Sequence, residues 1–342
     1  MATTRPVRIC LAASGGGHLR QLLDLRPFWE EQETHFITED TPLAEGLAAS
    51  NRVYLVPHFA FGQLRLQPFW KVAAAASRNM KAAWRVVRTE RPQMVVSTGA
   101  GAVFFPVLFA KVRGARFVLV ESFARFEAPS LFARLARRFA DVVIVQSKRL
   151  HEIWPDAEFF DPFVLLDAAV KPKEDLGFLT VGTVMPFDRL VKAVASLPKN
   201  LRPSQIVAQV GRGGTRPEGM DVREVVDFGE LTEILDRTNL VFCHGGTGSL
   251  ITALRAGCRI VAMPRRADLG EHYDDHQQEI VSAFSARGLI EVAAEASEMK
   301  AAVQRALVKQ PQRATTDPVA LIERLRSLMS EWFPKQSGHY SK

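Results

Sequence analysis

One stretch decides the fold: Asn239-Leu-Val-Phe-Cys-His-Gly-Gly-Thr-Gly-Ser-Leu-Ile-Thr-Ala-Leu-Arg-Ala-Gly-Cys-Arg-Ile-Val-Ala-Met263. Residues 239–243 predict a strand, residues 249–256 predict a helix that Gly257 ends, and residues 259–263 predict a second strand. A glycine-rich turn between strand and helix aims backbone N–H groups and the positive end of the helix dipole at one point. Such a point suits a diphosphate. The alternative is a tight corner whose small residues serve packing alone.

The same alternation of strand and helix runs through both halves of the chain. It predicts strands at Val7–Ala13, Thr34–Thr38, Arg52–Val56, Gln93–Ser97, Arg116–Glu121 and Asp141–Gln146, then at Gly177–Gly182, Ser204–Val210, Val222–Asp227, Asn239–Cys243 and Arg259–Met263. Alternation over about 150 residues favours a parallel sheet covered by helices on both faces, and its repetition favours two domains.

We therefore predict an α/β fold of two Rossmann-like domains facing a central cleft. The first domain covers residues 1–165 and the second covers residues 176–317, with the linker in 161–175, where prolines and mixed charges interrupt the pattern. Residues 318–342 are predicted to form a last helix and a tail, and this helix could pack back on the first domain.

Glycine clusters stand where the predicted strands end. They lie at residues 14–17, 97–101, 182–183, 211–214 and 245–246. In α/β sheets ligands bind outside the carboxyl ends of the strands, so five clusters there indicate more than packing. No cluster is followed by a P-loop lysine, and the spaced dinucleotide fingerprint is absent. The clusters favour a mononucleotide diphosphate over NAD or a hydrolysed triphosphate.

The composition is that of a packed cytosolic protein. Hydrophobic residues make up 47% of the 342 residues. The cysteines at 10, 243 and 258 lie in or beside apolar runs without paired spacing, which indicates reduced core residues. The uncharged run from Pro92 to Ala110 approaches the length of a membrane span, but Ser97–Gly101 and Pro106 interrupt it. We predict no span, and the apolar run 7–13 is too short for a signal peptide.

The net charge of +7 is concentrated in the first half of the chain. Residues 65–91 carry seven Lys or Arg against one Glu, and residues 111–149 carry nine against three acidic residues. Predicted helices at 69–88 and 131–139 mix these cations with aromatic residues, which favours an anionic membrane surface. RNA backbone and a plain solvated face are the alternatives, and no motif indicates a nucleic-acid module. We expect a cytoplasmic protein, peripheral on the inner face of the plasma membrane, without a nucleic-acid partner.

Two side chains are candidates for acid–base chemistry. His18 follows Ser14-Gly-Gly-Gly17 directly after the first predicted strand, and a histidine there suits a general base. Glu121 ends the strand Arg116–Glu121, and a carboxylate at the end of a buried strand is costly unless it is used or paired. The alternatives are a polar residue at a helix start for His18 and a salt bridge to Arg125 or Arg116 for Glu121.

A second group of polar residues follows the strand that ends at Met263. Gln277 and Gln278 can donate and accept, which suits sugar hydroxyls. His272 and His276 would share one helical face with Asp275 nearby, so a zinc site is an alternative, although no cysteine is close and no Asp-x-Asp occurs in the chain. We predict no metal and no cofactor.

These motifs resemble the glycosyltransferases of family 28. The stretches 177–191, 244–249 and 275–278 resemble the catalytic subunit of the eukaryotic enzyme that adds the second N-acetylglucosamine to dolichol diphosphate. The stretches 14–18, 97–101 and 120–122 resemble its membrane-recruiting partner subunit, so the chain looks like a fusion of the two. The run Glu271-His-Tyr-Asp-Asp-His-Gln277 resembles bacterial exopolysaccharide (sphingan-type) beta-1,4-glucuronosyltransferases most closely.

The resemblance implies a GT-B fold, an inverting reaction, a UDP-sugar donor in the second domain and a lipid-linked acceptor in the first. It implies donor binding by Thr183, Gly211, Arg212, Phe228, His244, Gly245, Gly246, Thr247, Gly248, Ser249, Gln277 and Gln278. It implies acceptor binding by Ser14, Gly15, Gly16, Gly17, Gly99 and Gly101, with His18 and Glu121 facing the acceptor as catalytic residues. Thr252 stands where the related peptidoglycan transferase has a Glu that holds ribose, so ribose recognition there departs from the family.

We predict an inverting, metal-independent glycosyltransferase that moves glucuronic acid from UDP-glucuronate onto a polyprenyl-diphosphate-linked glucose in exopolysaccharide synthesis. Glucuronate needs a cation for its carboxylate, and Arg212, Arg265 and Arg266 follow strands on the predicted ligand edge. Solvated loop charge is the alternative for these arginines. The other candidate functions are transfer from UDP-N-acetylglucosamine or UDP-glucose, a UDP-sugar epimerase, and a non-catalytic scaffold that recruits a glycosyltransferase to the membrane.

Overall fold

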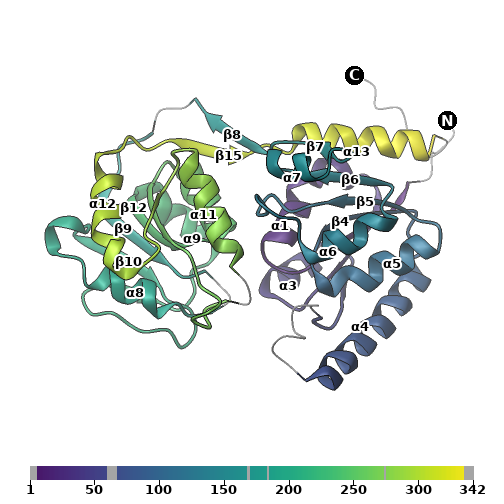
Figure 1. Cartoon of the computed structure of the whole chain (residues 1–342), viewed down its shortest axis with the longest axis horizontal. Helices are drawn as coiled ribbons and strands as arrows, with labels where there is room; N and C mark the ends of the chain where they lie inside the picture. The colour runs from purple at the N-terminus through teal and green to yellow at the C-terminus, as the bar shows by residue number, and fades with distance from the viewer. Residues whose placement is uncertain (1–5, 60–67, 168–169, 183–184, 273–274, 335–342) are drawn as a thin grey trace. The chain divides into compact units, whose positions relative to one another are not determined.

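A computed structural model describes residues 6–59, 68–167, 170–182, 185–272 and 275–334, without the side chains of Pro42, Leu43 and Phe228. The chain divides into two compact units. Unit 1 comprises Met1–Asp161 and Pro318–Lys342, and unit 2 comprises Pro162–Asp317. Each unit is a parallel sheet with helices on its faces (Figure 1).

Among the described residues of unit 1, seven parallel strands pair in the order β3-β2-β1-β4-β5-β6-β7. They are β1 (Arg8–Ala13), β2 (Glu33–Thr38), β3 (Val53–Leu55), β4 (Met94–Gly99), β5 (Arg116–Val120), β6 (Val142–Val145) and β7 (Glu158–Phe159). The central strands are buried along almost their whole length because both faces of the sheet are covered. The strand order reverses between β1 and β4, which are direct neighbours.

The helices of unit 1 connect these strands. They are α1 (Gly17–Asp24), α2 (Arg26–Trp29), α3 (Pro42–Ala48), α4 (Phe69–Glu90), α5 (Phe104–Val112), α6 (Leu131–Ala136), α7 (Lys148–Ile153) and α13 (Val319–Trp332), with short 3₁₀ turns η2 (Gly101–Val103) and η3 (Arg137–Phe139). Helix α4 is rich in Ala, Lys and Arg, which are strong helix formers, and Arg91 ends it in the left-handed conformation. Val86 and Val87 of α4 join a core cluster with residues of the sheet, and Val72, Asn79 and Ala83 are also buried.

Helix α13 belongs to unit 1 although it comes from the far end of the chain (Figure 1, yellow). Its apolar stripe (Leu321, Ile322, Leu325, Leu328 and Met329) joins the same core cluster as residues of α1, α2 and the sheet. Arg324 adds a two-pronged ion pair to Glu158 of β7, at 2.8 Å for each contact. The last helix therefore completes one face of the N-terminal core.

Among the described residues of unit 2, six parallel strands pair in the order β11-β10-β9-β12-β13-β14. They are β9 (Glu174–Thr180), β10 (Gln205–Gln209), β11 (Asp221–Arg223), β12 (Thr238–His244), β13 (Arg259–Met263) and β14 (Glu291–Val292). The helices are α8 (Asp188–Ala195), α9 (Phe228–Arg237), α10 (Thr247–Ala256), α11 (His276–Ala286) and α12 (Met299–Val308), with 3₁₀ turns η4 (Lys199–Leu201) and η5 (Ala296–Glu298). Here the strand order reverses between β9 and β12.

The structure differs from the predicted elements mainly at edges and connections. The predicted linker 161–175 contains strand β8 (Phe163–Leu166), which pairs antiparallel with β15 (Arg313–Thr316). The strand predicted at Val222–Asp227 ends early because Asp227 instead caps α9, accepting a hydrogen bond from the N–H of Glu230. Within the described residues, no helix is long and apolar enough to span a membrane.

Candidate active site

Glycine turns lie at the strand-order reversal of each sheet. In unit 1 the turn after β1 (Ser14–Gly17) adjoins the turn after β4 (Gly99–Gly101), and the N–H of Ser14 donates to the carbonyl of Gly99 at 3.2 Å. In unit 2 Gly182 follows β9, and Gly245 with Gly246 follows β12. These are the points where ligands bind in open α/β sheets. The sequence clusters therefore stand at strand ends, as their pattern predicts.

The helix that follows β12 has an uncapped N-terminus. Gly246 is the N-cap of α10, and it offers no side-chain hydrogen bond to the first turn. The side chains of Thr41, Ser130 and Asp227 cap helices α3, α6 and α9, whereas α10, like α1, α8 and α11, has no side-chain cap. The first N–H groups of a helix need acceptors from outside it, and with the helix dipole they favour an anion. A helix terminus of this kind at Thr247–Ser249 can bind a phosphate.

Gln277 braces this turn from α11. Its side-chain carbonyl accepts from the N–H of Gly245 at 3.1 Å and from the N–H of Arg265 at 3.0 Å. A Cβ at Gly245 would lie 2.9 Å from Val281 and 3.0 Å from Gln277, so glycine is needed there for packing against α11. The Gly245 amide, which the motif assigned to the diphosphate, therefore serves Gln277. The amides of Thr247, Gly248 and Ser249 are the better phosphate donors.

His244 fills the space between two glycine turns. A Cβ at Gly182 would lie 2.6 Å from its ring, and a Cβ at Gly246 would lie 2.2 Å from its Nε2. Burial, with the nearby charges of Arg265, His272 and His276, lowers the pKa of His244 to about 3. The ring is thus neutral at ordinary pH and contributes shape rather than charge.

The other residues predicted to bind the donor differ in their exposure and in how far the structure describes them. Gly211 begins a tight turn after β10 with a positive φ of 76°, and a Cβ at Gly214 would collide with the carbonyl of Val210 at 2.1 Å. The side chains of Arg212 and Gln278 are exposed. Phe228 begins α9, and its side chain is not described. Thr183 lies outside the described residues.

Arg265 and Arg266 are not arranged to bind a donor carboxylate, which corrects the prediction from their position. The buried Arg265 guanidinium donates to the carbonyls of Val181, Met185, Pro186 and Glu271. Arg266 pairs with both oxygens of Asp268 and with Glu295. Both guanidinium groups therefore hold the protein's own backbone and carboxylates.

The run from Glu271 to Gln277 does not form one helix. Helix α11 begins at His276, so His272 precedes it and the two histidines do not share a helical face. Their rings nonetheless contact edge to face, with centroids 4.8 Å apart. Within the described residues, no group of three or more His, Cys, Asp or Glu side chains is placed to hold a metal ion.

The glycine turns of unit 1 also precede helices without side-chain caps. Gly16 is the N-cap of α1 with φ 69°, and Ala100 precedes η2 with φ 86°, and neither supplies a side-chain hydrogen bond. A Cβ at Gly15 would collide with Thr41, and a Cβ at Gly99 would press on Phe132 at 3.1 Å. Gly16 and Gly17 are exposed, and no atom lies within 4 Å of a Cβ built at Gly16. These turns leave backbone accessible beside His18.

His18 is held in one orientation by β4. Its Nδ1 lies 2.7 Å from the carbonyl of Thr98, and the Thr98 hydroxyl donates to the His18 carbonyl at 2.8 Å. A carbonyl only accepts, so Nδ1 carries the proton in the neutral ring and the lone pair is on Nε2. The imidazole is partly exposed. A neutral imidazole whose tautomer is fixed in this way can act as a general base.

Glu121 is placed differently. Its carboxyl group is 1% exposed. One oxygen accepts from the N–H of Ser122 at 3.0 Å, and the other accepts from the N–H and the hydroxyl of Ser130 at 2.8 and 3.0 Å. Burial raises the pKa of Glu121, and these hydrogen bonds oppose the rise. The carboxyl group closes the loop 121–130 onto the N-terminus of α6.

A buried polar network beside Glu121 escaped the sequence reasoning. Gln21 of α1 donates to the Ser122 hydroxyl at 2.9 Å, and Gln146 donates to the Glu121 carbonyl at 2.8 Å. Gln146 directly follows the apolar strand β6 just as Glu121 directly follows β5, so the same rule could have found it. Gln21 looks in the sequence like an ordinary polar helix residue.

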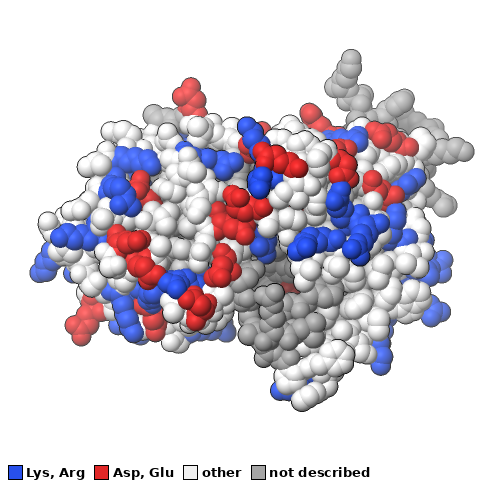
Figure 2. Space-filling view, in the orientation of Figure 1, with Lys and Arg blue, Asp and Glu red and all other residues white. Residues whose placement is uncertain are grey.

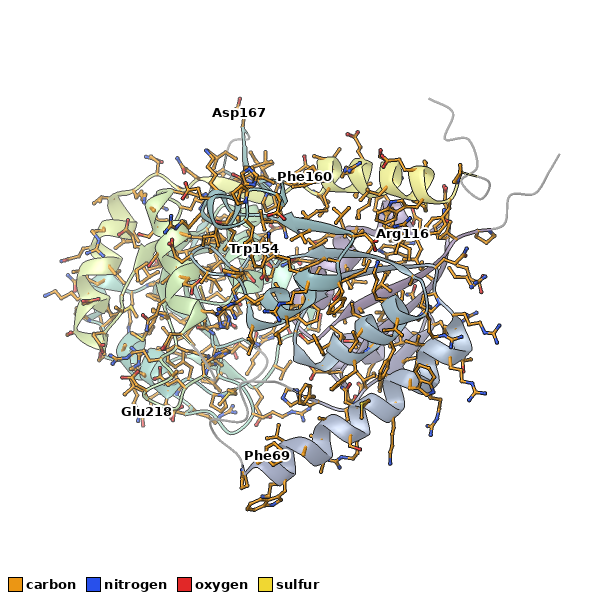
Figure 3. All side chains as sticks on the ribbon, turned by 45° about the vertical axis from the view of Figure 1, so that its right-hand side comes forward. Phe69, Arg116, Trp154, Phe160, Asp167 and Glu218 are labelled. Carbon is orange, nitrogen blue, oxygen red and sulfur yellow. The ribbon has the colours of Figure 1, made fainter. Side chains whose placement is uncertain are left out.

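The basic helices expose aromatic side chains as well as charge. On α4, Phe69 is 74% and Trp70 is 70% exposed, and Figure 3 shows Phe69 at the free end of the helix. Met80 and Trp84 are also exposed, among the exposed cations Lys71, Arg78, Lys81, Arg85 and Arg88. On α6 and η3, Arg134 and Arg138 are exposed whereas Phe132 is buried. Basic side chains gather over unit 1 on the face shown in Figure 2.

Comparison with known families matches both parts of the chain. Residues 178–331 match the glycosyltransferase family 28 C-terminal domain, and residues 65–163 match the family described as oligosaccharide biosynthesis protein Alg14 like. No curated protein matched the chain.

Solved structures resemble the whole chain at low identity. MurG of Acinetobacter baumannii aligns with a TM-score of 0.57 and 17% identity, covering 97% of this chain and 94% of that one. The glycotransferase of kitacinnamycin aligns with a TM-score of 0.61 and 15% identity, covering 97% and 96%. UDP-GlcNAc 2-epimerase of Methanocaldococcus jannaschii aligns with a TM-score of 0.61 and 11% identity, covering 95% and 100%. At such identities the likeness shows the fold alone.

The sheet topology, the placement of the glycine turns and the two matched families agree. The chain has the GT-B fold, residues 178–331 match the glycosyltransferase family 28 C-terminal domain, and residues 65–163 match the Alg14-like family.

Proposed function

We propose that the protein is an inverting glycosyltransferase that moves a sugar from a UDP-sugar to a polyprenyl-diphosphate-linked sugar. The observation that carries the proposal is the uncapped N-terminus of α10 at the strand-order reversal of unit 2, held in place by Gln277. The match to the family 28 domain supports a nucleotide-sugar donor, and the Alg14-like match supports a lipid-linked acceptor at a membrane.

The donor half of the reaction needs a stabilised leaving group. When the bond between the sugar C1 and the diphosphate oxygen breaks, negative charge develops on UDP. The N–H groups of Thr247, Gly248 and Ser249 and the helix dipole stabilise that charge without a metal ion. Preorganised donors of this kind are worth about 3 kcal/mol of barrier each, or about 10² in rate.

The acceptor half needs a base. His18, with its proton on Nδ1, accepts the proton of the acceptor hydroxyl on Nε2 while the hydroxyl oxygen attacks C1 from the face opposite the leaving group. The configuration at C1 is thereby inverted. Glu121 keeps the loop beside His18 in shape through its three hydrogen bonds, so of the two candidate bases we favour His18. The turns at Gly16–Gly17 and Gly99–Gly101 bind the diphosphate of the acceptor.

Glucuronate is our choice of donor sugar, and it stands on the resemblance to exopolysaccharide glucuronosyltransferases. Of the three arginines predicted to bind its carboxylate, Arg212 is the one that we keep, because Arg212 is exposed on the turn after β10. Competition among UDP-glucuronate, UDP-N-acetylglucosamine and UDP-glucose for transfer to a short-chain polyprenyl-diphosphate glucose tests the choice. If the protein preferred an uncharged donor, and Arg212→Ala transferred glucuronate as fast as the wild type, the choice of glucuronate would be wrong.

The N-terminal unit brings the protein to the inner face of the plasma membrane. The exposed aromatic residues of α4 insert among lipid headgroups while the neighbouring Lys and Arg side chains meet anionic lipids. A lipid-linked acceptor lies in the same membrane, so this attachment raises its local concentration.

A matched pair of variants at one position tests the diphosphate turn. Thr247 is the first residue of α10, where proline is well tolerated, and Gly246 before it has the extended ψ of 128° that a proline requires. Thr247→Pro deletes one N–H, whereas Thr247→Ala keeps it. We expect Thr247→Pro to weaken UDP binding at least tenfold in calorimetry and Thr247→Ala to weaken it much less.

The outcome also separates an enzyme from a recruiting scaffold. A scaffold needs no nucleotide, so wild-type protein that does not bind UDP would contradict the proposed function. Equal UDP affinity of Thr247→Pro and the wild type would show that the nucleotide binds elsewhere.

A further inference from the structure

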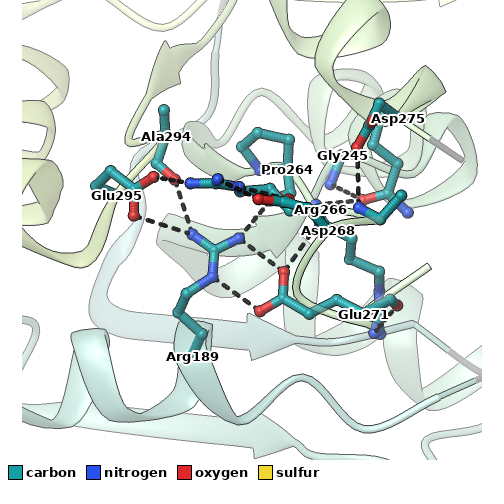
Figure 4. A network of polar contacts seen from close by, with 12 residues as sticks. Arg189, Gly245, Pro264, Arg266, Asp268, Glu271, Asp275, Ala294 and Glu295 are labelled. Carbon is teal, nitrogen blue, oxygen red and sulfur yellow. Dashed lines mark hydrogen bonds and ion pairs between the residues drawn. The ribbon is translucent and has the colours of Figure 1, made fainter.

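Arg189 and Glu271 form a two-pronged ion pair in unit 2 (Figure 4). Arg189 lies in the first turn of α8, and Glu271 lies in the connection between β13 and α11. The Nε and one terminal nitrogen of Arg189 each lie 2.8 Å from a separate carboxylate oxygen of Glu271. The side chains are only 16% and 14% exposed. A fork-to-fork pair of this kind is specific in geometry as well as strong.

The pair is the centre of a wider set of contacts to the segment that follows β13. Arg189 also donates to the carbonyls of Pro264 and Ala294, at 2.8 and 2.7 Å. Glu271 accepts from the N–H of Arg266 at 3.0 Å, so its carboxylate holds both ends of the turn 266–271. Further along, Asp275 accepts from the N–H of Ala267 at 2.9 Å. These contacts fix the turn 266–271 to α8 and to the start of α11.

A continuous chain of hydrogen bonds connects this segment with the diphosphate turn. The N–H of Arg265 and the N–H of Gly245 share the side-chain carbonyl of Gln277. The position of the backbone at 265–266 therefore decides where Gln277 lies, and Gln277 decides where Gly245 lies. Arg189 acts at the far end of this chain, through Glu271 and Arg266.

A partly buried ion pair of this kind is poorly explained by stability alone. Removing two charges from water offsets much of their attraction, so such pairs add little net stability compared with apolar packing. They do add specificity of conformation, because a fork-to-fork geometry admits one arrangement. This segment connects the sheet with the residues predicted to contact the donor, where one arrangement matters most.

We propose that Arg189 and Glu271 are positioning residues of the donor site, which hold the segment after β13 so that Gln277 keeps the diphosphate turn in its binding conformation. The proposal rests on the proposed function, because it assumes that a UDP-sugar binds at α10. Neither residue touches the nucleotide. Their substitution weakens binding of the donor and leaves binding of the acceptor unchanged.

Calorimetry with UDP on the full-length chain tests this. Arg189→Lys keeps the positive charge but cannot make the two-pronged contact. Glu271→Gln keeps the shape of the side chain but removes its negative charge. We expect each to raise the Kd for UDP about tenfold, an effect typical of coupled neighbouring residues. If the two act as one unit, the double variant raises the Kd no more than either single variant. In transfer assays the donor KM rises while the acceptor KM stays constant.

The same unit offers a matched control. Arg237 and Glu174 form an equally two-pronged pair, with both contacts at 2.8 Å, but the side chains are 59% and 54% exposed and lie away from β13. Arg237→Lys should leave the Kd for UDP unchanged.

The outcomes separate this inference from the proposed function. Wild-type protein that does not bind UDP would overturn both. Folded Arg189→Lys and Glu271→Gln with wild-type affinity, or a double variant with additive losses, would overturn the inference alone. If both single variants lost the fold of unit 2 by circular dichroism, the pair would be a requirement of the whole unit and the inference would also fail.

Discussion

At the scale of single residues, the two polar side chains proposed for catalysis have opposite surroundings. His18 is partly exposed and its Nδ1 lies against the Thr98 carbonyl, whereas the carboxylate of Glu121 is buried and accepts three hydrogen bonds. A group that exchanges a proton with substrate needs access, and a group that shapes a loop needs partners. We therefore propose His18 as the base and Glu121 as the residue that holds the loop in shape.

Substitution of each residue by glutamine distinguishes these roles. We expect His18→Gln to lower kcat 10² to 10⁴-fold, to leave the melting temperature nearly constant, and to remove the acidic limb of the pH profile. Glu121→Gln should instead lower the melting temperature of unit 1, because its amide group would meet an N–H donor where the carboxylate accepted one. A stable Glu121→Gln protein that loses the pH dependence would reverse the assignment.

Single residues also show what sequence reasoning could predict and what it could not. The sequence alone predicted glycines at the strand ends, because the patterns of a strand and of a turn each lie within a few consecutive residues. The use of the Gly245 amide by Gln277 was not, since the two are 32 positions apart and meet only through packing of α11 on the sheet. The arginines at 265 and 266 misled because the pattern does not show their partners, which include the nearby Asp268 as well as Val181 and Glu295 from distant segments.

At the scale of elements, α4 and α10 were predicted well because their signals lie within one helix. A periodic pattern predicted a helix at 69–88, and the structure has one at Phe69–Glu90. The pattern did not predict that Met80 and Trp84 would be exposed while Asn79 is buried. Asn79 donates to the carbonyls of Pro57 and Ala102, which ties α4 to the turn before α5. Such contacts form only when two elements pack together, so a pattern within one helix does not predict them.

Helix α4 carries a prediction about membrane binding. A Phe69→Ser, Trp70→Ser double variant should bind vesicles of phosphatidylglycerol and phosphatidylcholine at least tenfold more weakly, because two large exposed apolar side chains lose their contact with lipid. Raising salt from 0.05 to about 0.5 M should weaken the remaining binding, which depends on Lys and Arg.

Flotation of vesicles measures both effects. Val308→Ser, which removes an exposed apolar side chain from α12 of unit 2, is the control and should float like the wild type. Unchanged flotation of the α4 variant would show that another surface, or none, meets the membrane.

At the scale of the whole molecule, both sheets reverse their strand order at the strands that carry the ligand turns. Alternating strands and helices predicted two α/β units, and the structure has them. The pattern could not give the strand order, the β8–β15 pair or the partners of α13, because each depends on contacts between segments that are far apart in the sequence.

The core contribution of α13 can be tested without touching unit 2. Leu325 is buried against the N-terminal core, and Leu325→Asp places a charge there, so we expect unit 1 to melt well below its wild-type temperature. Differential scanning calorimetry should still show a transition that UDP raises, since binding to a folded state stabilises it. Val319→Asp, at an exposed position of the same helix, is the control. Loss of UDP binding in Leu325→Asp would show that the units do not fold independently.

Because α13 belongs to the N-terminal core, we expect the two units to complete their folding in the reverse of the usual order on the ribosome. Domains generally fold as they are synthesised, the first one first. Here residues 1–161 leave the exit tunnel with one apolar face still bare, and the helix that covers it is translated only after every residue of the other unit. We expect that the later-made half can finish folding before the earlier one, and that the uncovered apolar face of a nascent chain binds a chaperone or the membrane.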